Sequence, residues 1–193
     1  MTKHPTRRAL AVCLTLALLL VISYCLLGEA MDRYNESAYP IRYADTVEAA
    51  AAEHGFAPSL IYAVIHTESH FRPDVRSHAG ATGLMQITDD TYRWALQRAD
   101  QEDTYDPEGL LDPETNIRCG VYILHLLSEE FDHTETLLAA YNAGQGKVRQ
   151  WLEDPAYSED GKTLTHVPYT ETADYIDRVL KAQERYQQIY NIQ

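Results

Sequence analysis

The amino-acid sequence predicts a mostly α, multi-helix globule, preceded by one N-terminal transmembrane helix. Between residues 42 and 190, apolar residues recur at helical spacing, and start and stop signals for helices flank them. No alternating strand pattern and no Asn-Gly hairpin turn competes with this periodicity. An uncharged apolar run near the N-terminus provides the transmembrane helix.

The N-terminus is a short basic segment followed by this apolar run. Residues 9–27 contain no charge and would extend about 28 Å as a helix, close to the ~30 Å hydrocarbon core of a bilayer. Basic residues precede the run, so we expect a single-pass anchor in the cell membrane with its N-terminus in the cytoplasm and the rest of the chain outside. The alternative is a signal segment cleaved near Ala30, which would leave a secreted protein.

The sequence divides into three predicted parts. Residues 1–28 form the anchor or signal, and residues 29–41 form a polar linker that includes Pro40. Residues 42–193 have the length of one domain of ordinary size. We find no internal repeat in this domain.

Two helices are expected at the start of the domain. The first covers residues 42–54 and ends at Gly55, a residue suited to a left-handed C-cap. The second begins at Pro58, carries Glu68 and is broken before Pro73. The residues that follow are expected to form a loop.

Further helices are expected in the second half. Asp89 or Asp90 is a candidate cap for a helix that reaches about residue 99. Asp112 followed by Pro113 is a strong start signal, and the apolar run 119–127 predicts a helix surrounded by others. The remaining helices are expected at 134–142, at 147–152, and from a cap at Thr170 to about Tyr190.

Composition restricts the class of partner. The formal net charge is −13, and residues 1–28 contain three basic residues and no acid, so the remainder carries −16. This charge argues against nucleic acid or anionic lipid as an electrostatic partner of the domain. Of the three cysteines, only Cys119 lies outside the N-terminal run, which excludes a disulfide within the domain and favours a core role for its thiol.

Glu68 is the leading candidate for chemistry. On a helical wheel it lies within the apolar stripe formed by Leu60, Ile61, Val64 and Ile65, near the C-terminal end of its helix. Burial and the negative end of the helix dipole both favour the protonated carboxyl, the form that a general acid needs. A buried structural carboxyl is the alternative.

The residues around Glu68 form motifs that are found together in one enzyme family. Glu68-Ser69-x-Phe71 and the segment from Ser77 through Gly83-Leu84-Met85-Gln86 resemble the catalytic core of the soluble lytic transglycosylases. Two later segments, 139–151 and 168–176, match the same family in order and spacing. The resemblance covers roughly residues 40–190 and implies a goose-lysozyme-like fold with a substrate cleft.

The resemblance implies an activity on peptidoglycan. Glu68 would protonate the oxygen between N-acetylmuramic acid and N-acetylglucosamine, and the substrate acetamido group would stabilise the positive charge at C1. Glu68 would then accept the proton of the C6 hydroxyl, which leaves a 1,6-anhydromuramic acid end. By resemblance, the residues that contact the sugars or the acid are Ser77, Gly83, Met85, Gln86, Tyr141, Asn142 and Glu171.

Several residues remain open to other readings. Met85 and Tyr141 are also suited to the core, Asn142 to a helix end, and Glu171 to the first turn of a helix. Ala173 stands where the family often has arginine, which weakens any claim that this segment binds the anionic peptide stem.

Two other functions are alternatives to the transglycosylase. If a second acid such as Asp74, Asp89 or Asp90 reached the cleft, the chain would be a goose-type lysozyme-like hydrolase. A non-catalytic module that binds the cell wall is the other alternative, and the presence of both Glu68 and Tyr141 argues against it.

No metal or cofactor is expected. His66 and His70 have the i, i+4 spacing of a metal pair, but Glu68 lies on a different side of the helix. The order of these residues also differs from the zinc-protease motif.

Overall fold

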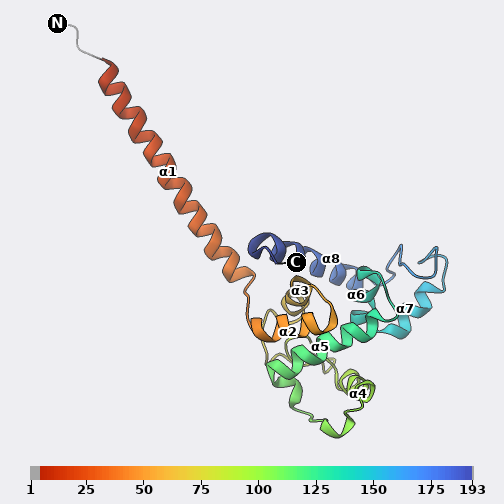
Figure 1. Cartoon of the computed structure of the whole chain (residues 1–193). Helices are drawn as coiled ribbons and strands as arrows, with labels where there is room; N and C mark the ends of the chain where they lie inside the picture. The colour runs from red at the N-terminus through yellow and green to blue at the C-terminus, as the bar shows by residue number, and fades with distance from the viewer. Residues whose placement is uncertain (1–4, 193) are drawn as a thin grey trace. The chain divides into compact units, whose positions relative to one another are not determined.

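The structure is a computed structural model that describes residues 5–192, and the backbone is mostly helical (Figure 1). It divides into two units, residues 1–40 and residues 41–193. Within the described residues, β structure is limited to isolated bridges in one loop, between Arg76 and Thr82 and between Thr82 and Ile87. The expected mostly α architecture is therefore confirmed.

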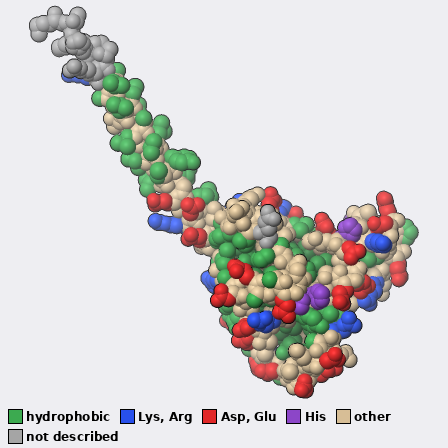
Figure 2. All heavy atoms as spheres, viewed as in Figure 1, with side chains coloured by type: hydrophobic (Ala, Val, Ile, Leu, Met, Phe, Trp, Pro, Cys, Tyr) green, Lys and Arg blue, Asp and Glu red, His purple; other side chains and the backbone are tan. Residues whose placement is uncertain are grey.

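The first unit is the helix α1 (Pro5–Ala38). From Arg8 to Ala38 it is long and apolar enough to cross a membrane, and its apolar side chains are exposed. Figure 2 shows these side chains along most of the helix, with charged groups gathered toward its C-terminal end. The helix continues to residue 38, so most of the polar stretch expected to be a linker is helical.

The second unit begins with α2 (Ala44–His54) and α3 (Pro58–Ser69). Gly55 ends α2 in the left-handed conformation, as expected, with φ of 74°. Pro58 occupies the first turn of α3, where its missing N–H costs nothing. The end of α3 differs from expectation, because the helix stops at Ser69, before the proline that was expected to break it.

The next elements are α4 (Asp89–Arg98), two short 3-10 helices (Glu102–Thr104 and Gly109–Leu111) and α5 (Pro113–Ser128). The expected α4 cap is wrong by one residue, since the Thr88 hydroxyl, and neither aspartate, accepts the Thr91 N–H. Both aspartates instead occupy the first turn, where their negative charges interact favourably with the helix dipole.

α5 begins where the Asp112-Pro113 pair predicted a helix start. The Asp112 carboxylate accepts the Thr115 N–H at 2.8 Å, and Pro113 is the first helical residue. α5 packs against α2, α4 and α6, which makes it the central helix of the unit. Burial of its apolar side chains among these neighbours is its main source of stability.

The chain ends with α6 (Thr134–Ala143), α7 (Gln145–Leu152) and α8 (Thr170–Tyr190). The cap predicted for α8 is wrong, because Tyr169 holds the N-cap position and makes no side-chain cap bond. α8 lies along α3 and α6, and its contact with α3 is the most extensive between any two described helices (Figure 1). This pairing brings the C-terminal helix next to the helix that carries Glu68.

Candidate active site

Glu68 lies in the last turn of α3, where the chain makes an unusual reversal. His70 and Phe71 both have left-handed backbone angles, with φ of 52° and 59°. For residues with a Cβ this conformation is costly, and it persists only where surrounding contacts hold it. The fully buried Phe71 ring and the Ser69 hydroxyl, which donates to the Leu84 carbonyl at 2.8 Å, provide those contacts.

The Glu68 carboxyl is half-buried and shifted toward its protonated form. Burial raises its pKa from 4.5 to about 7. Hydrogen bonding from Tyr175 and the positive charge of Arg178 lower the pKa, but burial outweighs both. The group can therefore give and take a proton near neutral pH.

The Tyr175 phenol is buried on α8 beside this carboxyl. Its hydroxyl acts on Glu68 as a hydrogen-bond donor, although the pair falls outside strict hydrogen-bond geometry, and within the described residues the hydroxyl has no other partner. Burial first, and then the charge of Glu68, raise the pKa of Tyr175 well above 10. The phenol thus stays neutral and keeps its proton.

Tyr141 is the second phenol near the acid. Its hydroxyl donates a hydrogen bond to the Met85 carbonyl at 2.8 Å, so the hydroxyl proton points to the loop and not to Glu68. Burial raises the pKa of Tyr141, and the charge of Glu68 adds to the effect, which places the ring near the carboxyl. Tyr141 therefore fixes the loop that lies beside the acid.

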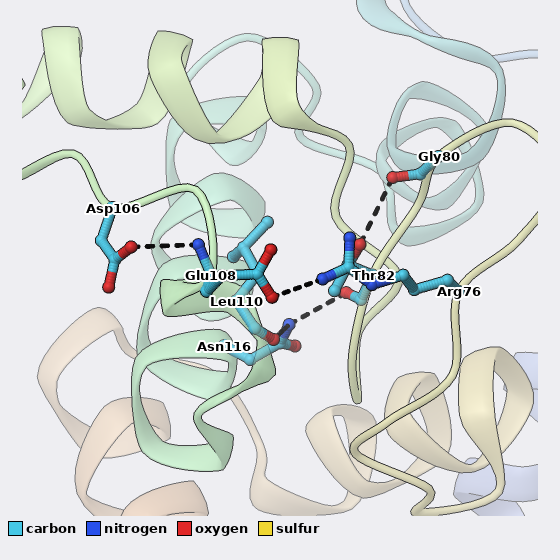
Figure 3. Close-up of polar contacts among 7 residues, drawn as sticks. All are labelled: Arg76, Gly80, Thr82, Asp106, Glu108, Leu110 and Asn116. Atoms are coloured by element: carbon cyan, nitrogen blue, oxygen red, sulfur yellow. Dashed lines mark hydrogen bonds and ion pairs between the residues drawn. The ribbon is translucent and has the colours of Figure 1, made fainter.

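The loop at 82–87 is held from its other side by Asn116 of α5 (Figure 3). This buried amide donates to the carbonyls of Thr82 and Leu110 at 3.0 and 2.8 Å, and accepts the Met85 N–H at 2.8 Å. An ion pair at 2.7 Å between Arg76 and Glu108 lies at the surface of the same region. The loop is thus fixed by side chains from distant parts of the chain.

Two glycines allow this close packing. Gly83 has φ of 80°, and a Cβ there would overlap the Asn116 amide and the Leu110 carbonyl. A Cβ on Gly120 of α5 would overlap the Met85 side chain. Any larger residue at either position would displace the loop.

The other residues that correspond to sugar ligands by resemblance lie in the segment 77–86, at the end of α6 and at the start of α8. The Ser77 oxygen is exposed and accepts the Ala81 N–H at 3.0 Å. The half-buried Gln86 has φ of 48°, and its amide donates to the Val75 and Gly83 carbonyls at 3.1 and 2.8 Å. Met85 is fully buried, whereas Asn142 at the end of α6 and Glu171 in the first turn of α8 are exposed.

The candidate second acids lie at the surface. Asp89 is exposed, pairs with Arg93 at 2.8 Å and accepts a hydrogen bond from Tyr105. These two interactions lower the pKa of Asp89, with the Tyr105 bond as the larger cause. Asp90 is also exposed, as is Asp74.

The two histidines with the spacing of a metal pair lie close to each other. The His66 and His70 rings lie with their centroids 4.9 Å apart. Across residues 5–192, no group of three or more His, Cys, Asp or Glu side chains is arranged to hold a metal ion.

Sequence reasoning missed the roles of Tyr175 and Asn116. Tyr175 fits the apolar stripe of α8, and only the packing of α8 on α3 places its hydroxyl beside Glu68. Asn116 had one available signal: an amide within an otherwise apolar face of α5, which requires a buried hydrogen-bond partner.

Comparison with known proteins agrees with this geometry. The chain is 34% identical over 155 residues to the soluble lytic murein transglycosylase of Escherichia coli K12, covering 79% of this chain and 24% of that protein. It is 40% identical over 115 residues to the membrane-bound lytic murein transglycosylase F of Desulfosudis oleivorans, covering 56% and 23%. The chain thus spans about a quarter of the length of these relatives.

Solved structures show the same fold. The 70 kDa soluble lytic transglycosylase of Escherichia coli superposes with a TM-score of 0.70 at 31% identity, over 80% of this chain and 25% of that one. An inactive glutamate-to-glutamine mutant of the Pseudomonas aeruginosa enzyme Slt gives 0.68 at 31% identity, over 79% and 25%. The Transglycosylase SLT domain family matches residues 45–164. The chain belongs to this family.

Proposed function

We propose that the chain is a peptidoglycan lytic transglycosylase that cleaves the β-1,4 bond between N-acetylmuramic acid and N-acetylglucosamine. The observation that carries the proposal is the Glu68 carboxyl, which burial brings to a pKa of about 7 beside a neutral phenol. A group with this pKa can act as an acid and then as a base at neutral pH.

The proposed reaction needs one protein carboxyl and no water. Glu68 gives its proton to the glycosidic oxygen as the bond to C1 breaks, and the substrate acetamido oxygen stabilises the positive charge at C1. The Glu68 carboxylate then takes the proton of the C6 hydroxyl while O6 bonds to C1. Glu68 is left protonated for the next cycle, and the product carries a 1,6-anhydromuramic acid end.

The arrangement of acids supports this reaction over hydrolysis. A hydrolase would need a second carboxylate to act as nucleophile or as base for water. Asp89 is bonded to Arg93 and Tyr105, and Asp90 is exposed in the first turn of α4. The inactive glutamate mutant of the Pseudomonas relative supports the assignment of one essential glutamate.

The substrate would lie against the loop that Asn116 and Tyr141 fix. We propose that Ser77, Gln86 and the backbone at Gly83 and Met85 line this side of the cleft, and that Asn142 and Glu171 line the opposite side. Ser77 and Asn142 are exposed, which suits direct contact with sugar hydroxyl and acetamido groups. No cofactor is needed for the proposed steps.

We further propose that α1 anchors the enzyme in the cell membrane as a single span. Its length and hydropathy suit a bilayer crossing, and membrane-bound relatives belong to the same family. Basic residues precede the apolar run, which favours a cytoplasmic N-terminus and an extracytoplasmic catalytic unit. Protein sequencing of the mature form that begins at Met31 would contradict the anchor and favour secretion.

Mass spectrometry of murein digested by the full chain tests the activity. The expected products end in anhydromuramic acid and are lighter by one water than the reducing products of a hydrolase. Products with reducing ends would show instead that the chain is a lysozyme-like hydrolase. Intact murein after incubation with folded protein would favour a wall-binding module without activity.

A further inference from the structure

A hollow of about 370 Å³ lies on the surface of the second unit, between α4 and the 3-10 helix Glu102–Thr104. Its volume is within the range of ~300–1,000 Å³ that is typical of small-ligand sites. None of the residues assigned to the proposed catalytic cleft lines it. Leu96 and the half-buried indole of Trp94 are apolar parts of its lining.

The polar groups around this hollow are free to bind a ligand. Asp90, Gln97 and Glu102 line it and are exposed. Within the part of the chain that the structure describes, none of these three side chains makes a hydrogen bond or ion pair. They therefore offer carboxylate acceptors and an amide that can both donate and accept.

Arg93 completes the lining and limits the kind of ligand. Its guanidinium lies 3.6 Å from the centroid of the Tyr105 ring and also pairs with Asp89. One face of Tyr105 is thus already occupied by a cation, and Trp94 is the remaining indole or phenol platform. The lining thus includes a guanidinium as well as carboxylates and an amide, so it offers both hydrogen-bond donors and acceptors.

A pyranose ring matches this lining. Its C–H face is apolar and packs on an indole, while each hydroxyl both donates and accepts hydrogen bonds. Carboxylates accept from hydroxyls, and the Gln97 amide and Arg93 N–H groups donate to them.

We propose that the hollow formed by Trp94, Asp90, Gln97 and Glu102 is a second glycan-binding site, outside the catalytic cleft, that holds the sugar strand of peptidoglycan. The identity of the sugar polymer rests on the proposed function. α4 begins three residues after Gln86, so the site lies on the element that directly follows the proposed substrate loop. A strand held there would stay attached to the protein between cleavage events.

Binding by catalytically silent protein tests the site separately from turnover. The protein used is the full chain in detergent micelles with the substitution Glu68→Gln, which prevents turnover. The measured quantity is its affinity for glycan strands from which an amidase has removed the peptides. Adding Trp94→Ala is expected to weaken binding about five- to tenfold, as loss of one aromatic platform would. Trp94→Phe should stay within about twofold of the parent.

A matched control lies on the same helix. Arg98→Ala removes an exposed side chain that pairs with Glu129 and does not line the hollow, so binding should not change. If Trp94→Ala fails to fold, the exposed double variant Gln97→Ala with Glu102→Gln replaces it, with an expected loss of about two- to fivefold.

Two results would overturn the site. Folded Trp94→Ala that binds stem-free strands as tightly as its parent removes the sugar assignment. A loss that is seen only with peptide-bearing murein assigns the hollow to the peptide and not to the sugar. The catalytic proposal is tested separately, by the products that the unmodified chain releases from murein. A failure of the catalytic proposal is therefore distinguishable from a failure of this binding site.

Discussion

Glu68 and Asp160 carry the same functional group in opposite environments. Glu68 lies between α3 and α8, and burial raises its pKa to about 7. Asp160 lies in the loop between α7 and α8, where the N–H groups of Thr163 and Lys162 hold its pKa at about 2. Backbone donors make the loop carboxyl a fixed acceptor, whereas the scarcity of donors around Glu68 keeps a proton available for chemistry.

The largest effect is expected from removing the carboxyl of Glu68. Glu68→Gln keeps the shape of the side chain but has no proton to give, so turnover of murein should fall by a factor of at least about 10²–10⁴. Release of muropeptides measures it. Glu159→Gln, at an exposed site, is the matched control. Undiminished turnover by Glu68→Gln would end the catalytic assignment.

The loop beside the acid depends on Asn116. Asn116→Ala leaves the Met85 N–H and two carbonyls buried without their partner, which should lower the free energy of unfolding by about 2–4 kcal/mol. Denaturant unfolding measures the change. The surface variant Gln97→Ala should stay within about 0.5 kcal/mol of the parent. If Asn116→Ala were as stable as the parent, the loop would not depend on the hydrogen bonds of Asn116.

The raised pKa of Glu68 also predicts how stability depends on pH. Between pH 4.5 and about 7 the folded carboxyl keeps a proton that the unfolded chain releases, so stability should fall as pH rises through this window and level off above it. The contribution is on the order of 1–3 kcal/mol. Urea unfolding of the parent and of Glu68→Gln across this range isolates it, since the variant should lack this slope. Identical slopes would contradict the shift.

Tyr175 should set the pH at which activity is lost. Its hydrogen bonding lowers the pKa of Glu68, so Tyr175→Phe should raise that pKa and move the alkaline limb of the rate profile to higher pH. Tyr62→Phe is the matched control, because Tyr62 is also a buried phenol, but the charges that act on it are those of Glu48 and Asp45 and not that of Glu68. Equal profiles for both variants would exclude the role of Tyr175.

A smaller shift in the same direction is expected from Arg178. Arg178→Gln removes the charge that lowers the pKa of Glu68, so the alkaline limb should again move up, and salt should reduce the difference because Arg178 is exposed. The exposed control Lys162→Gln should leave the limb in place. A shift that is insensitive to salt would point to a structural change instead.

Local signals in the sequence predicted much of the fold. Gly55 and the Asp112-Pro113 pair act within one turn of their own position, and both end or start helices as expected. The predicted caps at Asp89 or Asp90 and at Thr170 were each displaced by a residue or two, because neighbouring residues compete for the same position.

The site could be predicted only in part. The apolar stripe around Glu68 predicted a raised pKa, and burial does raise it. The residue beside the carboxyl, Tyr175, and the residue that fixes the loop, Asn116, could not be predicted. Both reach the site through the packing of α8 and α5 on segments that are distant in the sequence. Contacts of this range have no signature in local spacing.

The reversal at His70 and Phe71 has a consequence for protein engineering. The acid, the Ser69 hydroxyl that reaches Leu84 and the buried Phe71 ring all lie within residues 68–71, so the strained bend and the reactive group form a single unit. Grafting the glutamate alone onto another helical scaffold would move the carboxyl without the bend that directly follows it. A designer would have to transplant the four consecutive residues together with a pocket for the aromatic ring.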